Sequence, residues 1–68
     1  MKEISIYSEY IKLEQFLKIA DIVASGGEAK AFIADNLILI NKEEEKRRGR
    51  KLYKGDVIEV LNKTYKIC

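Results

Sequence analysis

Hydrophobic residues recur with two different periods along the first third of the chain. Ile4 and Ile6 alternate with polar neighbours, which is the pattern of a half-buried strand. From residue 12 onward, four apolar residues fall at i, i+3, i+4 and i+7, so they lie on one face of a helix. These four residues are Leu13, Phe16, Leu17 and Ala20. The pattern predicts a strand that leads into a short helix.

A second helix is predicted to begin at Ser25 and to run to about Asp35. Ser25 can cap the helix N-terminus while Glu28, three residues later, reaches back to it, which is the arrangement of a capping box. Asn36 suits the left-handed conformation that often ends a helix. The residues expected to face inward are Ala29, Phe32 and Ile33.

The remainder of the chain returns to a period of two. Residues 37–40 are apolar at every position, as in a central strand with both faces covered, and Asn41-Lys42 after them resembles a turn. Further strands are predicted over residues 57–61 and 64–67, with a turn at Asn62-Lys63 between them.

These elements predict an α+β fold in which two short helices, antiparallel to each other, pack on a small and mostly antiparallel sheet. The expected core residues are Leu13, Phe16, Leu17, Phe32, Ile33, Ile38, Ile40 and Val60.

The composition supports one small folded domain over residues 1–68. Hydrophobic residues make up 47% of the chain and charged residues 35%, a mix that disfavours disorder. No apolar run approaches the roughly 20 residues that a membrane span needs, and the first residues lack the apolar core of a signal peptide. A cytoplasmic protein is therefore expected.

The side chains available for catalysis are few. Histidine is absent, and the single cysteine, Cys68, is expected to remain a free thiol in a reducing compartment. Glu43, Glu44 and Glu45 resemble a metal cluster, but neighbours in a strand point to opposite faces, so solvated acids are the expected interpretation. We predict neither an enzyme nor a bound metal or other cofactor, and no small-molecule substrate.

Charge is distributed unevenly, although the net charge is only +2. Residues 46–51 have the sequence KRRGRK. Arginine can bind a phosphate with two N–H groups at once, and lysine adds a mobile positive charge, so both side chains are suited to binding phosphate. Gly26-Gly27 at the start of the second helix would let a phosphate approach backbone amides, although a glycine-rich link is also an ordinary turn. Together the two features place nucleic-acid binding on an equal footing with a merely solvated loop.

Four sequence blocks occur in a characteristic order: K-L-E-Q-F-L at 12–17, S-G-G-E-A-K-A-F-I at 25–33, I-L-I-N at 38–41 and G-D-V-I at 55–58. In this order and spacing they resemble the RNA-binding domain named after ribosomal small-subunit protein four, also called the alpha-L motif. The resemblance covers about residues 11–60, and the chain is most similar to the small YaaA/YbcJ-type members of that family.

The resemblance implies non-catalytic binding of structured RNA, with ribosomal RNA or a ribosomal particle as the expected partner and ribosome assembly as the setting. Carried over by position, the RNA-binding residues are Lys12, Ser25, Gly26, Gly27, Lys30, Lys46, Arg47, Arg48, Arg50 and Lys51. Residues 46–51 would form a phosphate-facing hairpin beside the second helix, and the acids at 43–45 would begin a strand or orient that hairpin. Lys12 and Gly26 stand where the family has arginine, and Lys42 where it has glycine.

Two other functions remain open. A protein-interaction adaptor could dock its basic hairpin on an acidic partner. DNA binding is less favoured, because no Asn, Gln or Arg side chain occurs between Gly26 and Asp35 to contact base edges.

Overall fold

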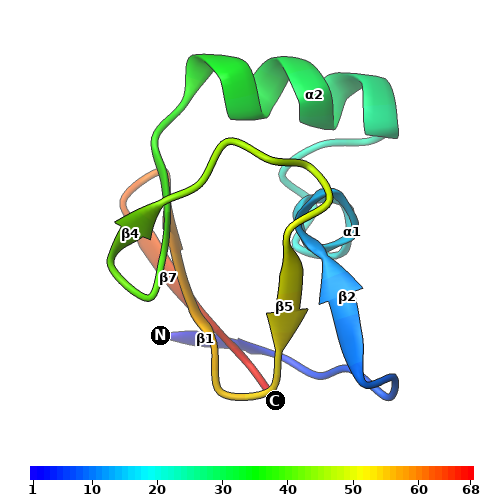
Figure 1. Ribbon diagram of the computed structural model, residues 1–68, viewed down its shortest axis with the longest axis vertical. Coiled ribbons are helices and arrows are strands. Elements are labelled where there is room, and N and C mark those ends of the chain that lie inside the picture. Colours follow the sequence, from blue (N-terminus) through cyan, green and yellow to red (C-terminus); the bar gives the residue numbers. More distant parts are fainter.

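Seven strands and two helices follow one another in the computed structural model, which describes residues 1–68 (Figure 1). Their bounds are β1 Lys2–Ile4, β2 Tyr10–Lys12, α1 Leu13–Ile19, α2 Gly26–Asp35, β3 Ile38–Ile40, β4 Glu43–Glu44, β5 Lys51–Tyr53, β6 Val57–Val60 and β7 Lys63–Ile67. Neither helix has the length and apolar character that crossing a membrane would require.

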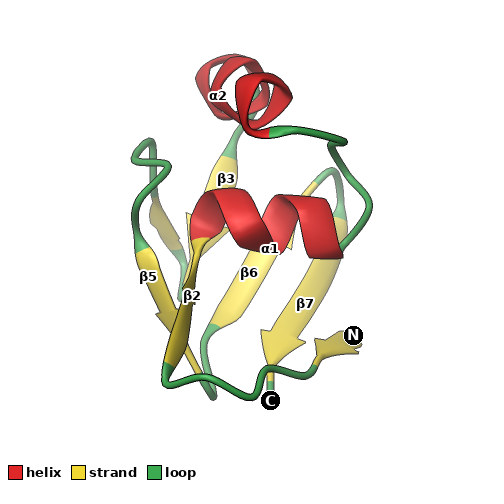
Figure 2. Ribbon diagram, turned by 90° about the vertical axis from the view of Figure 1, so that its right-hand side faces the viewer, coloured by secondary structure: helices red, strands yellow, loops and turns green.

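The strands form one sheet of five strands and one ribbon of two. The five-stranded sheet has the order β1-β7-β6-β3-β4, and all its neighbours are antiparallel except β1 and β7. β2 and β5 form the separate antiparallel ribbon. Figure 2 shows α1 in front of the five-stranded sheet, α2 above its end and the ribbon at one side. The predicted α+β fold with a mostly antiparallel sheet is confirmed.

The helices do not lie antiparallel to each other, so that part of the prediction is wrong. In Figure 1, α1 is seen end-on while α2 lies across the view. In Figure 2, which is turned by 90°, α1 lies across the view and α2 is seen nearly end-on. The helices therefore cross. The link between them allows this, because Asp21 adopts a left-handed φ of 61° directly after α1.

The core lies between the two helices, the ribbon and the inner face of the five-stranded sheet. Phe16 is fully buried, and its ring meets that of Tyr65 edge-on with centroids 5.2 Å apart. All the predicted core residues are buried except Phe32, which packs partly buried against the core. Ala29, expected to face inward, and Ile4 and Ile6 of the expected half-buried strand are also buried. The buried hydrophobic residues that the sequence did not single out are Ile11, Val23, Leu52, Ile58, Tyr65 and Ile67.

α2 begins and ends in ways that the sequence predicted only in part. Ser25 Oγ accepts a hydrogen bond from Glu28 N at 3.2 Å, which confirms the predicted cap. The Glu28 carboxylate, however, accepts from Ala24 N at 3.0 Å, one residue before the position that a capping box requires. Asn36 has an extended φ of −130°, so the left-handed prediction is wrong. Its side chain instead donates to the Phe32 carbonyl oxygen at 3.0 Å. This hydrogen bond gives a partner to one of the carbonyl groups that the helix leaves unpaired at its C-terminal end.

Two tight turns connect β3 to β4 and β6 to β7. Asn41 and Lys42 have φ values of 52° and 72°, so the predicted turn forms with a lysine in the left-handed region. Lys42 Nζ then reaches Glu59 Oε1 at 2.6 Å. The second turn uses Leu61 and Asn62, with φ values of 52° and 61°, one residue earlier than predicted.

The I-L-I-N and G-D-V-I blocks contact each other in space. Gly55 has a φ of 99°, a conformation that glycine adopts without strain, and Asp56 follows it. The Asp56 carboxylate accepts from Asn41 Nδ2 at 3.0 Å and from Tyr53 N at 2.8 Å. Asn41 Oδ1 in turn accepts from Val57 N at 3.0 Å. These contacts join the end of β5 to the sheet.

Candidate nucleic-acid interface

Residues 45–50, here called the basic loop, cross from one sheet to the other. β4 before the loop pairs with β3, whereas β5 after it pairs with β2. The loop passes beneath α2 on its way (Figure 1). The predicted hairpin over residues 46–51 is therefore wrong, because Lys51 pairs with Lys12 of β2 and not with a residue of β4.

The backbone of the basic loop is docked on the first turn of α1. Leu13 N donates to the Arg50 carbonyl oxygen at 2.8 Å, and Glu14 N donates to the Arg48 carbonyl oxygen at 3.1 Å. N–H groups in the first turn of a helix have no acceptor within the helix, so the carbonyl oxygens of the loop act as their acceptors. Lys12 just before them is also held, since Lys12 N donates to Gln15 Oε1 at 2.8 Å.

The other end of the basic loop is attached to the last turn of α2. Lys46 Nζ donates to the Ile33 and Asn36 carbonyl oxygens, at 3.1 and 3.2 Å. A cation is favourable at this end of a helix, because the unpaired carbonyls carry partial negative charge. Lys46 therefore lies at the opposite end of α2 from Gly26, and it holds the loop in place.

Glu45 is the first residue of the basic loop and is buried, with 7% of its side chain exposed. Its Oε2 accepts from Lys46 N, Arg47 N and Arg47 Nε, each at 3.0 Å. Its Oε1 accepts from Arg47 Nη2 at 3.0 Å and from Arg50 Nη1 at 2.8 Å. The expectation that Glu45 is a solvated acid is therefore wrong. Glu43 and Glu44 are exposed, and as β4 they do begin a strand.

This network shifts the ionisation of both partners. The hydrogen bond from the Arg47 side chain holds the pKa of the Glu45 carboxyl well below its usual range, against the opposing effect of burial, and the Arg50 side chain adds to the lowering. The same hydrogen bond raises the pKa of Arg47. Arg47 and Arg50 thus share one buried negative charge and offer phosphate less positive charge than two free arginines would.

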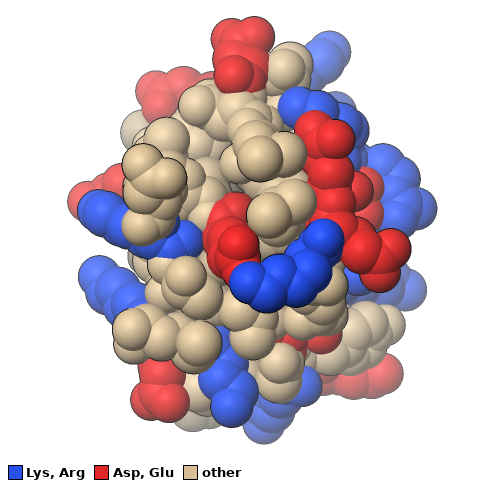
Figure 3. Space-filling model, turned by 90° about the vertical axis from the view of Figure 1, so that its left-hand side faces the viewer, with Lys and Arg blue, Asp and Glu red and all other residues tan.

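Four predicted bases have no carboxylate partner. The ion pairs of the chain join Lys42 to Glu59, Lys46 to Glu44, and both Arg47 and Arg50 to Glu45. The exposed bases outside these pairs that the sequence singled out are Lys12, Lys30, Arg48 and Lys51. On the side of the molecule seen in Figure 3, by contrast, acidic and basic side chains are intermixed around uncharged surface.

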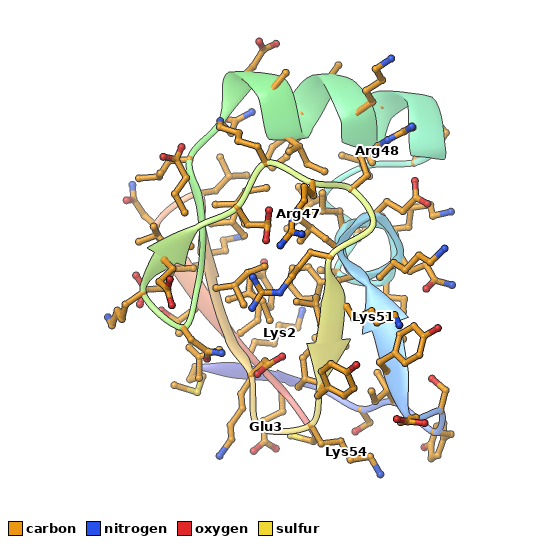
Figure 4. The ribbon with its side chains drawn as sticks, in the orientation of Figure 1. Lys2, Glu3, Arg47, Arg48, Lys51 and Lys54 are labelled. Carbon is orange, nitrogen blue, oxygen red and sulfur yellow. The ribbon has the colours of Figure 1, made fainter.

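The start of α2 lies next to the basic loop, with Glu14 between them. A Cβ atom added to Gly26 would lie 3.7 Å from Glu14 Oε2. The backbone N–H of the same Glu14 donates a hydrogen bond to the Arg48 carbonyl oxygen. Figure 4 accordingly shows Arg48 below the N-terminal half of α2. The Glu14 and Glu28 carboxylates both lie at this helix end, so the predicted phosphate site at Gly26 and Gly27 has acids beside it. It stays a prediction.

The structure thus gathers part of the predicted site around the start of α1. Lys12, Arg48 and Lys51 come together there with Gly26, because β2, the basic loop and the start of α2 all meet α1. Glu45 was missed as a functional residue. Its signal in the sequence is a carboxylate two residues before one arginine and five before another.

Comparison with known proteins agrees with the resemblance that the sequence blocks carry. A family model described as "S4 domain" matches residues 4–68, nearly the whole chain. The chain is 56% identical over 57 residues to a Bacillus subtilis (strain 168) protein named "Probable ribosome maturation protein RlbA", an alignment that covers 84% of this chain and 80% of that protein. The chain therefore belongs to the S4 domain family, the family of RNA-binding domains that its sequence blocks resemble.

Proposed function

We propose that this S4 domain binds structured ribosomal RNA during the maturation of a ribosomal particle. The observation that carries the proposal is a set of exposed bases without carboxylate partners, Lys12, Arg48 and Lys51, held around the start of α1. The name of the Bacillus subtilis relative supports the ribosomal setting.

The bases would contact phosphates, and the shape of the RNA would supply most of the selectivity. Double-stranded RNA is bound largely through phosphates and 2′-hydroxyls, because side chains cannot enter its deep and narrow major groove. Arg48 can grip a phosphate with two N–H groups, whereas Lys12 and Lys51 act as point charges. The basic loop would bind with little loss of freedom, since both its ends are already bonded to helices.

The remaining predicted residues would act around these three. Lys30 is exposed on α2 and would extend the basic surface, and Arg47 and Arg50 would present the N–H groups that Glu45 leaves free. Lys46 would hold the loop and Ser25 the helix start. Gly26 and Gly27 would leave room for close approach of the RNA backbone.

Ultraviolet crosslinking in cells, followed by sequencing of the attached RNA, tests the proposal. The parent should recover ribosomal RNA fragments, and a variant with Arg48→Gln and Lys51→Gln should recover far less. The matched control replaces Lys63 and Lys66, which are exposed on β7 without ion pairs, and should behave as the parent. Recovery of a protein partner and no RNA would favour the adaptor that the sequence left open.

A further inference from the structure

The outward face of the β2–β5 ribbon carries only tyrosine and lysine. The register places Tyr10 opposite Tyr53 and Lys12 opposite Lys51, with one residue pair between them. That middle pair, Ile11 and Leu52, is buried at 7% and 0% exposure. Because alternate residues of a strand point to opposite faces, the two tyrosines and two lysines share the other face.

The two rings are held by their neighbours. Their centroids lie 5.8 Å apart with the planes tilted by 50°, a geometry in which aromatic pairs attract. Lys51 Nζ lies 4.8 Å from the Tyr10 ring centroid, where a cation is attracted to the ring face. Figure 4 shows Lys51 extending from β5 toward β2. Tyr53 keeps 42% of its surface exposed, so a ligand can stack on its ring while the Tyr10 ring holds it in place.

The lysines beside these rings are unfavourably placed without a ligand. Like charges directly opposite each other across two strands are destabilising, and neither Lys12 nor Lys51 has a carboxylate partner. An anion between them would remove the repulsion. Two residues of strand separate the lysine pair from the tyrosine pair, about 7 Å, which is comparable to the separation of a nucleobase from its own phosphate.

We propose that this face of the ribbon binds an unpaired nucleotide, with its base stacked on Tyr53 and its phosphate between Lys12 and Lys51. The inference rests on the proposed function and narrows its ligand to structured RNA with an unpaired nucleotide beside a helix. Stacking on an aromatic ring accepts any base, so the site would select the unpaired state and not a base identity. The start of α2 and Arg48 would contact the adjoining helix.

A fluorescent hairpin RNA tests this site directly. The probe hairpin carries a single bulged nucleotide, 2-aminopurine. The comparison hairpin has the same stem and loop but lacks the bulged nucleotide. The parent should quench the 2-aminopurine and bind the bulged hairpin about five- to a hundredfold more tightly than the unbulged one. Tyr53→Leu should abolish both the quenching and the preference, whereas Tyr53→Phe, which keeps the ring, should retain them. Tyr7→Leu is the matched control, because Tyr7 is 98% exposed and lies outside the ribbon.

The outcomes separate this inference from the proposed function. Equal affinity of the parent for both hairpins, with no quenching, would overturn the stacking site. The proposed function would survive that result if replacing Arg48 and Lys51 still weakened binding. Failure of the parent to bind either hairpin or any ribosomal RNA fragment would overturn both. Quenching by the parent that Tyr53→Leu leaves unchanged, with its fold intact by circular dichroism, would assign the contact to another residue and also refute the site.

Discussion

Replacing Glu45 by glutamine should loosen the basic loop, because one carboxylate there accepts five N–H groups. A glutamine amide has one acceptor oxygen, and its nitrogen donates, so either the groups at Oε1 or those at Oε2 lose their acceptor. Hydrogen bonds to a charged group contribute about 1.5–3 kcal/mol each, but the Arg47 side chain is 74% exposed and can turn to water. We therefore expect a loss of about 1–3 kcal/mol in the free energy of unfolding.

Urea denaturation followed by circular dichroism measures this loss, with Glu43→Gln as the control, since Glu43 is exposed and makes no ion pair. The difference should depend on pH in a defined direction. The pKa of Glu45 is lowered in the folded state, so its stabilisation is fully present above the unfolded value of about 4.3 and is lost progressively as the pH falls from there through the lowered folded-state pKa. Parent and Glu45→Gln should therefore begin to converge in stability below about pH 4, and should meet only at strongly acidic pH, below the lowered pKa of Glu45.

Affinity for RNA gives an independent result for the same variant. Glu45→Gln raises the net charge by one, which alone would strengthen binding to phosphates. We expect weaker binding instead, because the loop that presents Arg48 is held less firmly without the Glu45 carboxylate. Equal unfolding free energies for the parent and Glu45→Gln would refute the structural argument. Tighter RNA binding by Glu45→Gln would show that Glu45 masks Arg47 and Arg50 and does not position the loop.

Three other changes test the remaining parts of the account. Phe16→Ala should cost about 3–5 kcal/mol of stability, and a variant that melts like the parent would contradict the core. Ser25→Ala should cost about 0.5–2 kcal/mol through loss of the cap on α2, measured by thermal melting. Gly27→Asp should keep the fold, since the nearest atom to an added Cβ is Ser25 Oγ at 3.9 Å, yet weaken RNA binding; unchanged affinity would remove Gly27 from the interface.

The sequence predicts what depends on local period and on the family blocks. The helices over residues 13–19 and 26–35 follow from apolar spacing and the Ser25 cap. β2 and β5 escaped prediction because each has three residues, too few to show an alternation, and they pair across about forty positions of sequence. That pairing is decided by burial of Ile11 and Leu52, which no local pattern reveals.

The sequence predicted which basic residues belong to the candidate site but not how they are arranged in space. The sequence shows five basic residues within positions 46–51 but not that the loop crosses between two sheets. The crossing buries Glu45, turns Arg47 and Arg50 toward it and sends Lys46 to the far end of α2. The tyrosine pair was missed for the same reason, since Tyr10 and Tyr53 meet only through the ribbon.

Salt dependence of RNA binding shows whether Lys12, Arg48 and Lys51 contact phosphates. Each phosphate contact contributes a log–log slope of roughly −0.7 to −0.9, so replacing Lys12, Arg48 and Lys51 by Gln should flatten the slope by about two to three and weaken binding to a ribosomal RNA fragment. The control replaces Lys2, Lys63 and Lys66, which are exposed on β1 and β7, and should keep most of the slope. If the Lys12, Arg48 and Lys51 variant binds that fragment as tightly as the parent at every salt concentration, these residues do not form the interface.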